Sequence, residues 1–277
     1  MRCTVEAVVP GGFESAGAWR RALFIRPWCG RDEMFLIDAL ESLPPAACAT
    51  ALLGRCVSLD GAKPAGAAFA ARLSAGDREA LLVQLRRLTL GDRLACVIVC
   101  QDCGEQMDLD IKVSDLLVGP YRYETEEHRA QFEAGGHSYA ARFRLPNGSD
   151  IEFAAAIVSH SEDNAVTAVL SRCVRSILDE DGGSADPLPG AVRDRISAAM
   201  AELDPQAEIA LECRCTGCGA GMRVIFDAAQ YVLREIAAGA QTLFQQVHEL
   251  ASGYHWRETD ILGLSARRRA RYAELLP

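Results

Sequence analysis

The chain has 277 residues, enough for one large domain or two small ones with a sizeable core. It is 49% hydrophobic and 24% charged, which is typical of a globular protein, and no apolar run reaches the roughly 18–20 residues that a membrane-spanning helix needs. The net charge of −9 argues against nonspecific nucleic-acid binding, which needs a cationic surface.

The first predicted elements are helices. One is expected after the Gly-Arg-Asp-Glu stretch at 30–33, and a second helical piece runs through 52–56. The stretch 74–91 predicts an amphipathic helix, because four leucines recur at helical spacing between an N-cap serine, Ser74, and a terminating glycine. Asp77 occupies the capping-box position, three residues after the serine.

Two strands with a cysteine pair between them follow. Residues 93–99 are apolar and β-branched, and residues 107–113 alternate apolar with charged side chains, so both segments predict strands. Between them lies Cys-Gln-Asp-Cys-Gly at 100–104. A Cys-x-x-Cys-Gly tip on a hairpin is typical of one half of a zinc site.

The middle of the chain predicts a connector and an added hairpin. Residues 120–141 are expected to be a polar connector, with helical character over 121–137. The segments 139–146 and 151–157 predict a β-hairpin around Asn147-Gly148, because Asn-Gly favours a type I′ turn.

The second half repeats the order of the first. A helix that ends at Asp204-Pro205 leads into predicted strands at 208–213 and 222–227, and Cys-Thr-Gly-Cys-Gly at 215–219 lies between them. A long helix is predicted from 228 to 254, since its apolar residues form one continuous face.

The C-terminal sequence Ser-Ala-Arg-Arg-Arg-Ala-Arg at 265–271 predicts a short helix. Its four arginines, at 267, 268, 269 and 271, are expected on a solvated or partner-facing side.

Several patterns recur at a nearly constant spacing. The two cysteine tips are 115 residues apart (215 − 100), Arg-Cys-Val at 55–57 recurs 117 residues later at 172–174, and Gly30 corresponds to Gly148 at 118. A shift that drifts slowly is what duplication followed by small insertions would leave, so we predict an internal duplication. The predicted segments are an N-terminal segment (1–23), a first repeat (24–119), a connector (120–141), a second repeat (142–235) and a C-terminal helical segment (236–277).

The two tips together predict one metal site. The expected ligands are Cys100, Cys103, Cys215 and Cys218. Four thiolates make a closed tetrahedral site without an open position, so we predict one structural zinc per chain, in a split zinc ribbon to which each repeat contributes half. Cys213 is the alternative to Cys215, although at the shift of 115 it aligns with the strand residue Ile98.

The remaining cysteines are predicted to be core thiols. They are Cys3, Cys29, Cys48, Cys56, Cys96 and Cys173. The N-terminal sequence lacks the character of a secretory signal, so a cytoplasmic location is expected, where thiols stay reduced.

The sequence carries no Gly-x-Ser-x-Gly, phosphate-binding loop or dinucleotide fingerprint, so it predicts a protein that is not an enzyme. A thiol-dependent enzyme would need an open zinc position or a reactive cysteine of low pKa. The other alternative is a zinc-ribbon regulator that binds nucleic acid, which the acidic net charge disfavours.

Four stretches resemble a known family: RPWCGRDE at 26–33, LTLGDRLACVIVCQDCGEQMDLDI at 88–111, FRLPNGSDIE at 143–152 and, most specifically, VHELASGYHWRETDILGLSARRRARYAELL at 247–276. They are similar to the baseplate-associated proteins of phage-tail-like contractile injection systems, which are related to the baseplate hub assembly chaperones of T-even-like phages. The resemblance implies a non-enzymatic role in baseplate assembly, with the hub, the spike or other tail proteins as partners and with no membrane. The sequence therefore predicts a mostly helical α+β pseudo-dimer that acts through protein–protein contacts.

Overall fold

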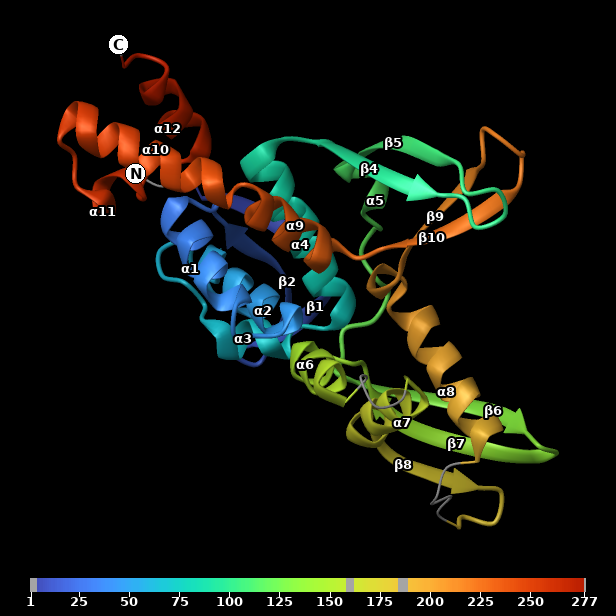
Figure 1. The fold of residues 1–277 in the computed structure, drawn as a ribbon. Helices are drawn as coiled ribbons and strands as arrows, with labels where there is room; N and C mark the ends of the chain where they lie inside the picture. The colour runs from blue at the N-terminus through green and yellow to red at the C-terminus, as the bar shows by residue number, and fades with distance from the viewer. Residues whose placement is uncertain (1–3, 158–161, 184–188, 277) are drawn as a thin grey trace.

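The computed structural model describes residues 4–157, 162–183 and 189–276. These residues form a mixed α+β fold with antiparallel strands, so the predicted α+β class is confirmed. Figure 1 shows a first lobe at the centre, a second lobe below it, two hairpins that project to one side, and C-terminal helices at the end opposite the second lobe. Within the described residues, no helix is long and apolar enough to cross a membrane.

The first lobe contains a three-stranded sheet covered by helices. Its strands, in the spatial order β1-β2-β3, are β1 (Val5–Ser15), β2 (Ala18–Ile25) and β3 (Val57–Ser58). Its helices are α1 (Gly30–Leu40), α2 (Pro45–Cys56), α3 (Ala67–Arg72) and α4 (Ala75–Leu90). The turn between β1 and β2 uses positive φ at both Ala16 and Gly17, as a two-residue hairpin turn requires. The sequence analysis predicted neither of these two strands.

Helix α4 begins and ends as predicted, but its capping differs. The Ser74 side chain accepts the N–H of Asp77, and Gly91 ends the helix with φ 102°. The carboxylate of Asp77 does not return to Ser74 to complete a capping box. It instead accepts the N–H groups of Gly11 (2.7 Å) and Gly12 (2.9 Å), where the β1–β2 register is irregular. The buried Asp77 therefore joins α4 to the first sheet.

The second lobe repeats this arrangement. Its sheet has the order β6-β7-β8, with β6 (Glu127–Ala134), β7 (His137–Arg144) and β8 (Val174–Asp179). Its helices are α6 (Gly148–Ile157), α7 (Glu162–Cys173) and α8 (Gly190–Leu203), and a 3₁₀ turn, η1 (Pro205–Ala207), follows. The predicted helical character of 121–137 is wrong, because Gly135 and Gly136 adopt φ 60° and 85° and turn the chain into the β6–β7 hairpin.

The hairpin predicted around Asn147-Gly148 is also wrong. The Asn147 side chain accepts the N–H of Asp150 (3.3 Å), and the Asp150 side chain accepts the N–H of Asn147 (3.0 Å). These reciprocal bonds are those of a helix start, so 148–157 continues as α6 and not as a strand.

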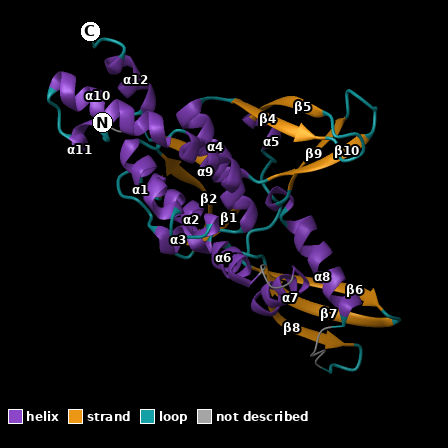
Figure 2. Cartoon of the chain, in the orientation of Figure 1, coloured by secondary structure: helices purple, strands orange, loops and turns teal. Residues whose placement is uncertain are grey.

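Two β-hairpins project side by side from the first lobe (Figure 2). The first pairs β4 (Arg93–Val99) with β5 (Gln106–Lys112), and the second pairs β9 (Ile209–Arg214) with β10 (Gly221–Phe226). All four strands were predicted to within two residues. The short helix α5 (Val113–Leu116) follows the first hairpin.

The predicted helix at 228–254 is two helices, α9 (Ala228–Ala238) and α10 (Ala240–Tyr254), separated at Gly239. The N–H of Gly239 is shared between the carbonyls of Glu235 and Ile236, which is typical of a helix end. Two short helices, α11 (Glu258–Ile261) and α12 (Ala266–Ala273), complete the chain. Arg269 of α12 is buried, so the four arginines do not lie on one solvated face as predicted.

Three apolar cores hold these parts together. The largest combines the first lobe with residues of α9, among them Val232, Leu233 and Ile236. A second core lies inside the second lobe, and a small third core lies between the two hairpins. Of the predicted core cysteines, Cys29, Cys48, Cys56 and Cys173 are buried, Cys96 is half-buried, and Cys3 lies outside the described residues.

An ionic network occurs at the same place in each lobe. The two networks are Arg26–Asp32–Arg55 and Arg144–Asp150–Arg172. In both, the aspartate lies at the start of a helix and is buried between two arginines. One arginine is the last residue of the preceding strand (Arg144) or follows it directly (Arg26), and the other comes from the end of the next helix. Burial alone would raise the pKa of Asp150, but its hydrogen bonds, that from Arg144 first, lower it to about 2.

Candidate metal centre

The two cysteine tips have the same backbone geometry. In the first tip, the N–H of Cys100 bonds the carbonyl of Glu105, and the N–H of Gly104 bonds the carbonyl of Cys100, both at 2.9 Å. The second tip repeats both bonds at 2.9 Å, from Cys215 to Ala220 and from Gly219 to Cys215. Gly104 and Gly219 adopt φ 75° and 77°, a left-handed conformation that a side chain would make costly.

The four cysteines that the sequence analysis singled out come together. Their Sγ atoms all lie within 4.8 Å of one another. The Sγ atoms of Cys100 and Cys218 are 3.7 Å apart, and those of Cys103 and Cys215 are 3.5 Å apart. A tetrahedral zinc with Zn–S bonds of about 2.3 Å has sulfur–sulfur edges of about 3.8 Å. The cluster therefore has the size and donor type of a tetrathiolate metal site.

One thiol on each tip faces inward. Cys100 and Cys215 are buried, whereas Cys103 and Cys218 are exposed. The Cys215 sulfur accepts the N–H groups of Gly217 (3.3 Å) and Cys218 (3.5 Å). The bond from the Cys218 N–H is the main reason that the pKa of Cys215 is lowered to about 7. These N–H groups therefore favour the thiolate form of Cys215, which is the form that binds a metal ion.

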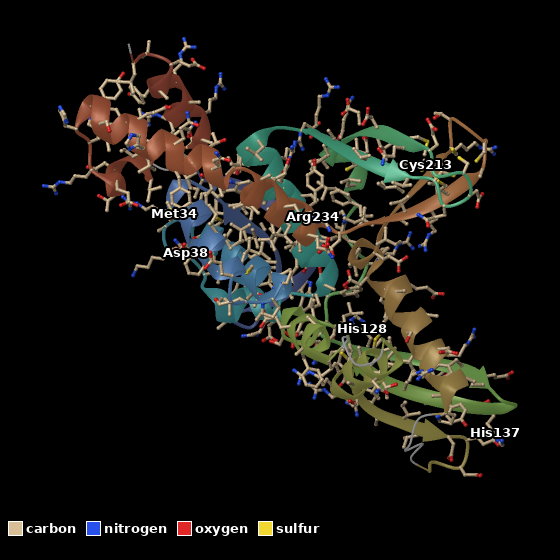
Figure 3. All side chains as sticks on the ribbon, viewed as in Figure 1. Met34, Asp38, His128, His137, Cys213 and Arg234 are labelled. Atoms are coloured by element: carbon tan, nitrogen blue, oxygen red, sulfur yellow. The ribbon has the colours of Figure 1, made fainter. Side chains whose placement is uncertain are left out.

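Cys213 lies outside the cluster. It pairs with Met222 across the second hairpin and belongs to the small core between the hairpins, with Ile98 and Met107 of the first hairpin. Figure 3 shows it between the two hairpins. Its half-buried side chain packs as a small apolar residue. This agrees with the repeat alignment, which places Cys213 at an ordinary strand position.

A metal ion bound by this cluster would have no free coordination position for a reaction. Four thiolates around one ion make a closed coordination sphere, so no position remains for an activated water or a substrate. Among the residues that the structure describes, this is the one group of three or more potential ligands close enough to share an ion. What such a site can do is join two hairpins that are more than a hundred residues apart in the sequence.

A groove of about 1050 Å³ opens next to the hairpins. Its walls are β4 and β10, and its floor is α9, with Tyr231 and Arg234. Val97 and Ile225 on the walls are 66% and 50% exposed, which is unusual for apolar side chains on facing strands. The sequence analysis did not single out this groove, because its walls come from hairpins that only the tertiary structure brings together.

The family model described as T4 bacteriophage base plate protein matches residues 18–231. The match includes both cysteine tips and ends before α10. The stretch 247–276, which contributed the most specific part of the resemblance, lies beyond it. No curated protein and no solved structure matches the chain.

Proposed function

Because the chain belongs to the T4 bacteriophage base plate protein family, we propose that it is a non-enzymatic assembly factor or component of a phage-tail-like baseplate. It would act through protein–protein contacts with the hub, the spike or another tail protein. The family match over residues 18–231 is the observation that carries this proposal.

The chemistry of the described residues supports a role without catalysis. The buried carboxylates of Asp77 and Asp204 accept backbone N–H groups, from Gly11 and Gly12 in the first case and from Gly76 in the second. Burial raises the pKa of both, yet each is used to join segments of the fold. Groups with shifted pKa values can mark active sites, but buried hydrogen-bond networks shift them as well.

We also propose that Cys100, Cys103, Cys215 and Cys218 hold one structural zinc. The donor set, the separation of the sulfur atoms and the matching tips support this assignment. When bound, the ion would supply a cross-link between the first and the second half of the chain and would activate no ligand.

An internal duplication accounts for the matched halves, and we include it in the proposal. Both lobes have a sheet with the same strand order, a buried aspartate paired with two arginines, and a cysteine hairpin. The residues of the arginine–aspartate networks and of the cysteine tips are offset by 115 to 118 positions. An experimental structure tests this directly, because superposing 24–119 on 142–235 should bring the two cysteine tips into register.

Within the family role, we propose transient assistance to assembly. A permanent ring component would need a large apolar interface, whereas an assembly factor needs a moderate and partly polar one that it can release. Outside the groove between the hairpins, the exposed large apolar side chains of the described surface are scattered over different elements, among them Phe35, Leu90 and Phe244. The net charge of −9 also favours a soluble carrier over a nucleic-acid binder.

Deletion of the gene and mass spectrometry of purified, contraction-competent particles test the proposal together. We expect the deletion to block particle formation, and wild-type particles to contain little or none of this chain. Recovery at a fixed, symmetric copy number per particle would show a permanent baseplate component. Normal particles from the deletion strain would remove the assembly role altogether.

A further inference from the structure

The start of α12 repeats the start of α4. Residues 264–269 read Leu-Ser-Ala-Arg-Arg-Arg, and residues 73–78 read Leu-Ser-Ala-Gly-Asp-Arg, an offset of 191 (264 − 73). The preceding helices, α11 and α3, begin at the same offset (258 − 67). The N-cap serines have nearly the same backbone angles, φ −70° and ψ 156° at Ser265 and φ −58° and ψ 159° at Ser74.

Both segments dock against a helix that begins with glycine. The N–H of Gly30, at the start of α1, bonds the carbonyl of Leu264 at 3.3 Å. The N–H of Gly148, at the start of α6, bonds the carbonyl of Leu73 at 3.2 Å. The two glycines correspond in the repeat and the two leucines correspond in the docked segments, so the same contact occurs twice.

The approach to each glycine is equally close. A β-carbon on Gly30 would lie 3.0 Å from the Cα of Leu262, and one on Gly148 would lie 3.0 Å from the Cα of Ala71. Leu262 and Ala71 are again 191 residues apart (262 − 71). Such contacts leave no room for a side chain on the receiving helix, so glycine is required there.

A buried arginine completes each contact. Arg269 is 2% exposed and bonds Glu33 of α1, the Gln246 side chain (3.1 Å) and the carbonyl of Leu264 (2.9 Å). Arg78, 3% exposed, bonds the Thr50 hydroxyl (2.9 Å), and that hydroxyl contacts Glu152 of α6. A chance similarity between two six-residue segments would not place their leucine, serine and arginine in the same way against a helix that begins with glycine.

We propose that the starts of α1 and α6 are two copies of one docking site, which recognises a helix start of the pattern Leu-Ser-Ala-x-x-Arg. The site on α6 holds α3–α4, and the site on α1 holds α11–α12, which we call the C-terminal unit. In this reading the C-terminal unit is a bound ligand of the α1 site and is not part of the first lobe's core.

The two occupants differ in how firmly they are held. Helix α4 runs for 16 residues through the largest core, where Leu81, Leu82 and Leu85 are buried. Helix α12 has 8 residues, and Arg269 is the one residue of it that is buried. The C-terminal unit should therefore detach without unfolding the first lobe, and another helix start of the same pattern could then replace it.

The test uses the full chain with Arg269→Ala, which weakens the chain's own occupant but leaves the α1 site intact. A labelled peptide of residues 258–276 should bind this variant at least about 100-fold more tightly than it binds the wild type, because the wild-type site is filled from within the same molecule. Unlabelled peptide 67–85 should compete. The peptide with Arg269→Ala should not bind, and adding Gly30→Ala to the chain should abolish binding.

Hydrogen exchange provides a second measurement that needs no peptide. Gly30→Ala should raise exchange in 258–276 by about tenfold or more while α4 stays protected. Gly190→Ala is the matched control, since Gly190 also begins a helix and a β-carbon there meets no described atom within 4 Å. Equal peptide binding by wild type and variant, failure of peptide 67–85 to compete, or exchange of 258–276 only together with α4 would each overturn the proposal.

Discussion

Removing one ligand of the four-cysteine cluster should separate the hairpin tips but leave both lobes folded. The bases of the hairpins belong to the largest core, through Leu94 and Ile111 on the first and Ile209 and Phe226 on the second. Among the described residues beyond these, the two tips are joined by the small core between the hairpins, by the cysteine cluster and by the bond from the Thr216 N–H to the Met107 sulfur (3.2 Å). Cys215→Ser should therefore act locally.

The size of the effect follows from the tips themselves. Ordering the backbone of residues 100–105 and 215–220 costs roughly 12–24 kcal/mol at about 1–2 kcal/mol per residue. Burial of Ile98 and Met107 between the hairpins contributes about 3–6 kcal/mol. A structural zinc contributes about 10–16 kcal/mol in small zinc-finger peptides. The favourable contributions match the cost of ordering the backbone only when the metal is included. The tips should therefore be disordered without it.

Metal analysis and hydrogen-exchange mass spectrometry measure the two consequences. The wild type should contain about one zinc per chain, and Cys100→Ser or Cys215→Ser should contain almost none. In these variants, or after chelation, exchange should rise at 98–107 and 213–222 but not in α2 or α4. Cys213→Ser is the matched control and should keep its zinc. Loss of zinc from Cys213→Ser with retention in Cys215→Ser would show that the ligand set is wrong.

Three further predictions concern stability and the C-terminus. Asp150→Asn should lower the free energy of unfolding, measured in urea at pH 7, by about 2–3 kcal/mol, because the native pKa of about 2 lies almost two units below the ordinary value. This stabilisation is present above about pH 4 and is lost as the pH falls through 2, whereas Glu127→Gln, in an exposed ion pair, should cost less than about 1 kcal/mol. Burial raises the pKa of Asp77 to about 7, so its contribution is complete below about pH 4 and is lost as the pH rises through 7. The melting temperature should accordingly fall between about pH 4 and 7, and Asp77→Asn should flatten that fall. Parallel curves for the two proteins would contradict this origin. Ending the chain after Ser265 should leave a folded, zinc-containing protein that binds its tail partner less well in a pull-down, and an insoluble product would indicate a structural cap instead.

Local sequence signals were sufficient to predict the two cysteine hairpins and helix α4. An N-cap serine, leucines at helical spacing and a terminating glycine act within one segment, so Ser74 and the residues after it could be read without knowing the rest of the fold. The same holds for the cysteine tips, whose Cys-x-x-Cys-Gly pattern specifies its own turn. The proximity of Cys100 to Cys215 was inferred because a closed zinc site needs four thiolates and each tip offers two, and the repeat explained their separation in the sequence.

The sequence-based predictions were wrong where one local sequence pattern is compatible with two different structures. Asn147-Gly148 is compatible with a hairpin turn, but the carboxylate of Asp150 bonds the N–H of Asn147 and begins a helix. Asp77 matches a capping box, yet its carboxylate bonds the β1 backbone, which lies 66 residues away. Arg269 is one of four similar arginines in the sequence, and only its contact with Glu33 distinguishes it. For Asp77 and Arg269 a contact distant in the sequence decides the outcome, whereas at Asn147 a contact three residues away does.

The position of the cysteine cluster indicates what a metal there would contribute. The halves of the chain already meet where α6 contacts the first lobe, at the Gly148 docking site. That contact does not hold the second hairpin against the first, because the tips lie at the other end of the strands from the cores that anchor them. An ion held by four thiolates would have no open position for a reaction, so its contribution would be positional. It would fix the hairpins relative to each other and set the shape of the groove between β4, β10 and α9. A partner that contacts both hairpins would therefore meet one rigid surface when the metal is bound and two independent hairpins when it is not.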